Sequence, residues 1–224
     1  MRNIFFGILA VLTIGCSKDE TTETGTEIPM SVTDIDGNIY NTVNIGNQTW
    51  LQKNLNVSKY RNGDPIPQVQ DPDQWATLTT GAWRYYDDDP ENGEIYGKLY
   101  NWYAVKDPRG LAPEGCHVPS DKEWTTLSTF LGSSAGGEMK AVDIANWTYP
   151  NTDATDNSNF TGLPGGIVIK NGTFHFIGDY GYWWSSTGID ASTAWNRSLG
   201  YNSEVICRSY DNKNYGFSVR CILK

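Results

Sequence analysis

Turn signals are the feature that most constrains this fold, because they divide the sequence into short runs that favour extended strands. Asp36-Gly37, Gly46-Asn47 and Asn171-Gly172 are pairs of the kind that close tight hairpins. Long runs with helical periodicity are scarce. The chain carries 9 Trp, 13 Tyr and 7 Phe, so we expect a core of aromatic rings set on short strands and turns.

Only one strong helix is predicted. Ser120 and Glu123 form a capping box, and Gly132 follows the last helical residue, which together mark both ends of a helix. Apolar residues at helical spacing give this segment one face for packing: Trp124, Leu127 and Leu131. A shorter helix is predicted over residues 98–105, because Asp107-Pro108 would stop it.

The remaining segments are predicted to form strands and loops. Residues 32–51 are predicted to form a three-strand meander. From residue 160 onward the sequence reads as successive antiparallel strands, the last of them over residues 216–223. Residues 133–165 are rich in small and polar side chains, with little periodicity beyond a helical turn predicted over 138–145. Irregular segments of that length within one domain are often functional. We therefore predict an α+β fold of mostly antiparallel short strands.

The first residues are typical of an export signal. Arg2 precedes an apolar run over residues 4–14, and this run is shorter than the roughly 18 residues needed to span a bilayer. Gly15-Cys16 resembles the lipobox of bacterial lipoproteins, although Thr13 stands where leucine is usual. We expect a signal peptide over residues 1–15 and a lipid on Cys16; secretion with an unmodified thiol is the alternative.

The segment after the cysteine is expected to be a tether. Ser17-Lys18-Asp19-Glu20 is similar to the short acidic signals that send some lipoproteins across the bacterial outer membrane. The expected location is therefore the outer membrane, facing the medium, with the membrane contacted through the lipid anchor. Residues 16–28 form the expected flexible tether, and residues 29–224 form one domain.

Net charge narrows the possible partners. The chain has 17 basic and 26 acidic residues and a sequence pI near 4.6. A surface with this balance repels phosphate backbones, which argues against nucleic acid as a partner. Anionic lipid surfaces are disfavoured for the same reason.

Six motifs, in order, resemble the Fibrobacter succinogenes major paralogous domain family: TDIDGNIYNTVNIGNQTWLQKNL, IYGKLYNWYAV, PEGCHVPSDKEWTTLSTFLG, FTGLPGG, GYWWSST and YGFSVRC. They extend over nearly all of residues 33–221. The family is similar to the C-type-lectin-like fold, which it is thought to share with formylglycine-generating enzymes. The resemblance implies a C-type-lectin-like α+β fold with one or two packed helices and long irregular loops, and a surface location. It does not name a ligand.

The cysteines leave several pairings open. With Cys16 lipidated, Cys116, Cys207 and Cys221 remain, and an exported protein can form a disulfide. The resemblance implies a Cys116–Cys221 disulfide, because Cys221 occupies the closing strand to which an earlier cysteine is tied in C-type-lectin-like domains. A Cys207–Cys221 disulfide and free thiols are the alternatives.

No motif of the sequence points to a zinc site or to an acid pair. It contains no H-E-x-x-H or C-x-x-C motif, and no local pattern singles out an acid pair for glycoside hydrolysis. His117 and His175 are each expected to be structural. Cys207 and Cys221 are candidates for the role of the copper-binding thiols in formylglycine-generating enzymes, but the residues around them do not match that site. We predict that the domain is not an enzyme and needs no cofactor beyond a candidate calcium ion.

Binding is the preferred function, with aromatic rings and oxygen clusters as the candidate sites. Exposed indoles can stack on sugar rings, and the candidates are Trp75, Trp83, Trp147 and Trp195. Calcium prefers oxygen ligands, which are dense in residues 87–94 and 151–159; the candidates are Asp87, Asp89, Asp153 and Asp156.

Ordinary solvated turns also explain both acidic clusters, and the E-P-N, Q-P-D and W-N-D tripeptides of calcium-dependent lectins are absent. We therefore predict a non-catalytic surface domain for recognition or adhesion, with a glycan favoured as ligand. A protein-binding or structural surface component is the alternative.

Overall fold

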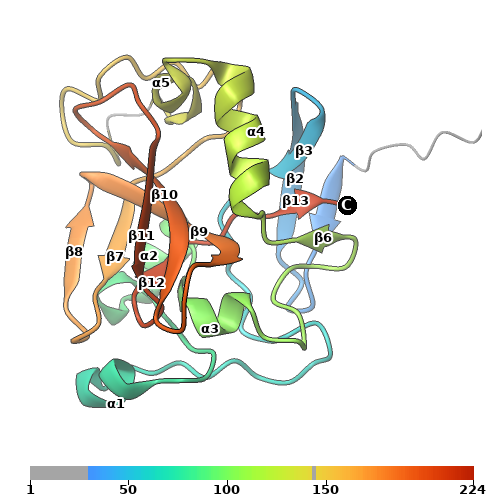
Figure 1. The fold of residues 1–224 in the computed structure, drawn as a ribbon, viewed down its shortest axis with the longest axis vertical. Helices are drawn as coiled ribbons and strands as arrows, with labels where there is room; N and C mark the ends of the chain where they lie inside the picture. The colour runs from blue at the N-terminus through green and yellow to red at the C-terminus, as the bar shows by residue number, and fades with distance from the viewer. Residues whose placement is uncertain (1–29, 143–144) are drawn as a thin grey trace, which may run out of the picture.

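Two sheets form the scaffold in the computed structural model of the chain, which describes residues 30–142 and 145–224 (Figure 1). The five-stranded sheet brings together both ends of the described chain, in the order β1-β2-β3-β13-β6. Its strands are β1 (Ser31–Thr33), β2 (Ile39–Ile45), β3 (Gln48–Leu51), β13 (Ile222–Leu223) and β6 (Cys116–His117). The predicted signal peptide and Cys16 lie outside the described residues.

The larger sheet has eight strands in the order β11-β10-β9-β7-β12-β5-β4, with β8 paired to β7. Its neighbours are antiparallel except β7 and β9, which meet in parallel at Gly166 and Gly181. Its strands are β4 (Trp83–Arg84), β5 (Leu99–Asn101), β7 (Gly165–Val168), β8 (Phe174–Ile177), β9 (Tyr180–Gly188), β10 (Thr193–Gly200), β11 (Cys207–Asn212) and β12 (Gly216–Phe217).

Helices are short apart from α4 (Asp121–Leu131), which packs against β9 and β10. Its predicted capping box is confirmed, with Ser120 and Glu123 bonded reciprocally, and the helix ends before Gly132. The other helices are α1 (Pro72–Thr77), the 3-10 turn η1 (Tyr86–Asp88), α2 (Pro90–Tyr96), α3 (Trp102–Val105) and α5 (Ala135–Met139). The predicted α+β class with mostly antiparallel strands is therefore confirmed.

Two local predictions hold and two need correction. The first meander and the hairpin around Asn171-Gly172 are confirmed. The helix predicted over 98–105 begins only at Trp102, because residues 99–101 pair with β4 and β12 and Asn101 then caps α3. The strand predicted over 216–223 divides into β12 and β13, one in each sheet.

The core consists of aromatic clusters on both faces of β9. Trp183 and Trp184 are fully buried and point to opposite faces because strand side chains alternate. Trp183 belongs to the cluster with Trp50 and Phe160, whereas Trp184 belongs to the cluster with Phe217. Each indole N–H is satisfied, Trp183 by Asn54 Oδ1 at 2.8 Å and Trp184 by the Tyr100 carbonyl at 2.9 Å.

The predicted Cys116–Cys221 disulfide is not formed in the structure, where both residues are free thiols. They lie on neighbouring segments in one core cluster, since Cys116 pairs with Leu223 two positions after Cys221. Burial raises the pKa of Cys116 to about 11 and also raises the pKa of Cys221. Both therefore behave as small apolar core residues, whereas Cys207 is an exposed free thiol on β11.

Among residues 30–142 and 145–224, no helix is long and apolar enough to cross a membrane.

Candidate functional site

Three of the four tryptophans predicted to face a ligand are buried. Trp75, Trp83 and Trp147 expose 0%, 6% and 2% of their surface. Trp83 donates to the Ile66 carbonyl at 2.8 Å, and Trp147 donates to the Gly162 carbonyl at 3.0 Å. These rings build the core, so the prediction that they stack on a ligand is wrong for all three.

Trp195 is half-buried, and its ring already contacts two other side chains of the chain. The guanidinium of Arg208 lies 3.3 Å from the ring centroid, and Tyr210 packs edge-on at 5.7 Å. Arg208 is itself held by the Asp121 carboxylate at 2.9 Å. This arrangement ties β10 and β11 to the start of α4, and it leaves one indole face covered by a cation.

The first predicted calcium cluster is used for local structure. Asp89 caps α2 by accepting from the Glu91 amide at 2.9 Å, and Asp88 forms an ion pair with Arg84. Asp87 has a φ of 53° inside the η1 turn. These carboxylates shape a turn rather than converge on a common centre.

The second cluster is organised by a lysine. Lys140 is fully buried, and its ammonium donates to the carbonyls of Thr152, Gly200 and Ser203 at 2.7, 3.1 and 2.8 Å. Nearby, Asp156 accepts hydrogen bonds from the amide and hydroxyl of Thr161, whereas Asp153 is exposed; both have positive φ. A cation from the chain itself therefore crosslinks this loop.

Within the part of the chain that the structure describes, no group of three or more His, Cys, Asp or Glu side chains could hold a metal ion. Calcium binding at Asp87, Asp89, Asp153 and Asp156 stays a prediction that would need backbone or amide oxygens to complete a site.

Partly exposed rings form a contiguous row on β8, β9 and the loop after β10. Phe176 is 45% exposed and lies 5.6 Å from Tyr180, which lies 5.9 Å from Tyr182 and 6.4 Å from Tyr201 by ring centroids. His175 extends the row, 5.6 Å from Phe176. We call these five residues the aromatic row.

Phe176 adopts a conformation that its side chain disfavours. Its φ is 70°, in the left-handed region where a side chain with a Cβ atom costs roughly 1–2 kcal/mol. Such strain persists only where surrounding structure imposes it, and it is enriched at binding sites.

Polar groups flank the aromatic row. The pairing register places Tyr182 opposite Ser198, which is opposite Cys207, so that one sheet face carries a hydroxyl and a thiol beside the rings. Burial raises the pKa of Tyr182 to about 12 and also raises the pKa of Asp211, which accepts from Asn196 at 2.8 Å. The Tyr182 hydroxyl therefore stays protonated and can act as a hydrogen-bond donor near neutral pH.

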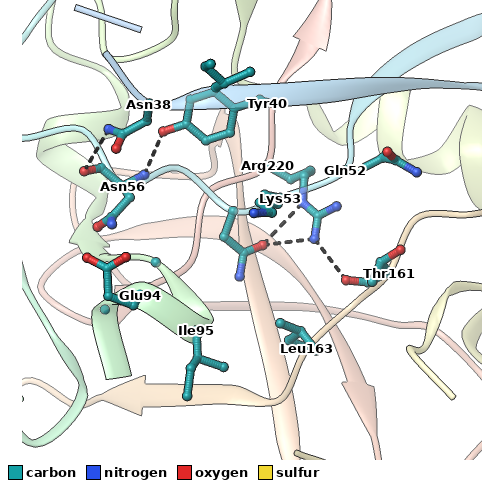
Figure 2. A pocket seen from close by; sticks show the side chains of 14 residues that line it. Asn38, Tyr40, Gln52, Lys53, Asn56, Glu94, Ile95, Thr161, Leu163 and Arg220 are labelled. Carbon is teal, nitrogen blue, oxygen red and sulfur yellow. Dashed lines mark hydrogen bonds between the residues drawn. The ribbon is translucent and has the colours of Figure 1, made fainter. Parts of the chain in front are cut away.

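A separate pocket of about 350 Å³ lies where four distant segments meet (Figure 2). Its walls come from the β1–β2 turn and β2, the segment after β3, helix α2 and the loop before β7, and Arg220 also lines it. We call it the Arg220 pocket. Its polar lining includes Asn38, Gln52, Lys53, Asn54, Asn56, Glu94 and Thr161, and its apolar lining includes Ile39, Ile95 and Leu163.

Arg220 is held in place by neutral oxygens. Its Nε and Nη2 donate to Asn54 Oδ1 at 3.2 and 3.1 Å, and its Nη1 donates to the carbonyls of Leu51 and Phe160. Nη2 also points to the Thr161 carbonyl at 3.5 Å (Figure 2). Burial lowers the pKa of Arg220 to about 9.

Sequence reasoning missed both the aromatic row and the Arg220 pocket. The segments HF, GYWW and GFSVRC, which carry Phe176, Tyr182 and Arg220, were predicted to form strands, but a strand pattern does not show which ring remains exposed. Asn54 and Arg220 are 166 positions apart, so their contact has no local signal.

The family comparison matches most of the chain. The family model described as the Fibrobacter succinogenes major domain matches residues 43–223, which include the aromatic row and most of the Arg220 pocket. No curated protein and no solved structure matches the chain.

Proposed function

Because this chain belongs to the Fibrobacter succinogenes major domain family, we propose that it is a non-catalytic recognition or adhesion domain whose aromatic row binds glycans. We further propose a C-type-lectin-like fold and an outer-membrane location through a lipid on Cys16. The sequence resemblance and the signal over residues 1–15 support these assignments.

The aromatic row is the observation that carries the glycan proposal. Sugar rings present flat C–H faces, and partly exposed aromatic rings offer apolar area with little side-chain entropy to lose. Tyr180 and Tyr182 stand on β9, so their rings have a rigid support. Phe176 is both strained and exposed, which is hard to explain by stability alone because a glycine would fit that backbone at lower cost.

Open rows of rings suit extended ligands better than single sugars. Phe176, Tyr180 and Tyr182 lie within 6.5 Å of one another by centroid, so a stacked glycan would contact several rings at once. We therefore expect the row to bind oligosaccharides more tightly than monosaccharides, because each further sugar adds buried area.

A protein partner is the second candidate, and β11 supports it. This strand is the edge of the larger sheet, and four consecutive residues from Cys207 to Tyr210 are exposed. Edge strands can pair with an extended segment of another chain.

A glycan array with the purified protein tests the proposal, run once with calcium and once with a chelator. The expected result is oligosaccharide binding in both conditions, because the aromatic row needs no metal. Tyr180→Ala should lower the binding at least severalfold. Phe130→Ala is the matched control, since Phe130 is 63% exposed on α4 and outside the row.

Two results would assign the binding site to a different part of the molecule. Binding that requires calcium would favour the acidic loops over the row. A blank array for the wild-type protein would favour a protein partner at the β11 edge.

The lipid anchor has its own test. Mass spectrometry of the mature protein from its native membrane should find Cys16 as the first residue and acylated. If Cys16 were unmodified, the result would favour the alternative, in which the protein is secreted without a lipid anchor.

A further inference from the structure

Arg220 differs from the other buried arginines in its partners. Among the described residues, Arg84, Arg197 and Arg220 are the buried arginines. Arg84 pairs with Asp88 and Arg197 pairs with Asp121. No carboxylate of the described residues lies within ion-pair distance of Arg220, whose hydrogen-bond acceptors are all neutral oxygens. A buried charge without a counter-charge is costly, and an anion in contact with it would reduce that cost.

The guanidinium has one weakly used donor at the pocket. The Nη2 contact to the Thr161 carbonyl is 3.5 Å long, beyond the 2.7–3.2 Å range of well-formed N–H···O bonds. The other contacts of Arg220 are between 2.6 and 3.2 Å. A ligand oxygen could therefore accept from Nη2 without breaking the contacts to Asn54 and Leu51.

A second cation lines the same pocket. Lys53 is exposed and lines the pocket together with Arg220 (Figure 2). Two cations beside one cavity suit a carboxylate, which accepts from both. Asp156 is the carboxylate that acts on Arg220 at longer range, and its own pKa is raised by burial.

The opposite wall suits hydroxyl groups. Glu94 and Ile95 project from α2 (Figure 2), where Glu94 is exposed. Asn56 and Gln52 add carboxamides, which can donate to and accept from hydroxyls. The volume of about 350 Å³ is at the small end of ligand pockets, the size class of a single sugar rather than a chain.

We propose that the Arg220 pocket binds a sugar-sized carboxylate of the hexuronate class, with its carboxylate on Arg220 and Lys53 and its hydroxyls on the carboxamides of Gln52 and Asn56. This site does not depend on the aromatic row. Tyr182 faces one side of β9, whereas Trp183 faces the other and shares Asn54 Oδ1 with Arg220.

Calorimetric titration of the purified protein tests the site with four probes: galacturonate, galactose, acetate and inorganic phosphate. We expect galacturonate to bind at least about tenfold more tightly than galactose, because only the former supplies the charge. Its affinity should fall as salt rises. Equal binding of galactose and galacturonate, or binding of neither, would overturn the proposal. Acetate or phosphate binding as tightly as galacturonate would overturn the sugar class.

Variants with opposite expected signs locate the site. Lys53→Met should weaken galacturonate binding about tenfold, and Glu94→Gln should strengthen it because a repelling charge is removed. Both residues are exposed, so these variants should fold. Lys122→Met on α4 is the matched control, since Lys122 is exposed and outside the pocket.

Unchanged affinity in Lys53→Met would show that any binding occurs elsewhere. Loss of glycan-array binding in Tyr180→Ala with retained galacturonate binding would show that the two sites are separate. Loss of both in that variant would contradict an independent pocket.

Discussion

Asp121 is expected to be one of the most important single charges for the stability of this domain. It occupies the first turn of α4 and accepts from Arg197 at 2.8 Å and from Arg208 at 2.9 Å. The Arg197 side chain is 2% exposed, whereas the Arg208 side chain is 46% exposed. Replacing Asp121 would therefore leave one buried and one solvated guanidinium without a carboxylate.

The magnitude follows from that difference in burial. Removing one partner of a buried pair costs about 3–5 kcal/mol, and an exposed pair contributes at most about 1 kcal/mol. Arg197 would keep bonds to the Asn196 carbonyl, the Asp121 carbonyl and Thr125 Oγ1, which favours the lower end. We expect Asp121→Asn to lower the free energy of unfolding by about 3 kcal/mol at pH 7. At roughly 2–4 °C per kcal/mol, the Tm should fall by about 6–12 °C.

The effect should also depend on pH with a defined sign. Burial alone would raise the pKa of Asp121, but hydrogen bonds from Arg208 and Arg197 hold it below the usual 3.8. The stabilisation is therefore fully present above the unfolded pKa and is lost as the pH falls through the lower folded pKa. The difference between the wild type and Asp121→Asn should narrow as the pH falls below about 4.

Urea denaturation followed by tryptophan fluorescence measures this difference, with Arg208→Ala as the control for the exposed half of the pair. We expect Arg208→Ala to cost no more than about 1 kcal/mol. A loss below about 1 kcal/mol in Asp121→Asn at pH 7, or a loss that stays constant from pH 7 to pH 3, would refute the reasoning.

Three further predictions concern strain, buried charge and thiols. Phe176→Gly should be more stable than Phe176→Ala by about 1 kcal/mol in urea denaturation, because only glycine adopts a φ of 70° without strain; the usual order, with alanine more stable, would contradict the strain. Lys140→Met should lower the free energy of unfolding by about 2–3 kcal/mol, since one buried and two partly buried carbonyls lose their donor; an unchanged Tm would show that water replaces the lysine ammonium. In the native protein a thiol reagent should label only Cys207 among residues 30–142 and 145–224, because Cys116 and Cys221 are buried with raised pKa values; labelling of all three without denaturant would contradict the packing.

Local hydrogen bonding explains where sequence reasoning succeeded. The capping box of Ser120 and Glu123 and the turn at Asn171-Gly172 depend on residues a few positions apart. Their geometry is set by backbone preferences and side-chain reach, which a sequence displays directly. The first meander follows from the same chemistry.

Contacts between segments far apart in the sequence explain which sequence predictions failed. Residues 99–101 carry a helical pattern, yet they form β5 because Gly216 and Phe217 pair with them from the end of the chain. The indoles of Trp75 and Trp147 were expected to face a ligand, but they are buried by segments that only folding brings together.

The sequence by itself determined the turns, the one long helix, the α+β class and the family. The tertiary structure decided which rings stay exposed and which charges stay unpaired. Contacts between distant segments leave Phe176 and Tyr180 partly exposed. Such contacts also bring Arg220 into the same pocket as Lys53 and Asn54. Burial is a property of the whole packed chain, so the residues that can bind a ligand were not visible from their neighbours in sequence.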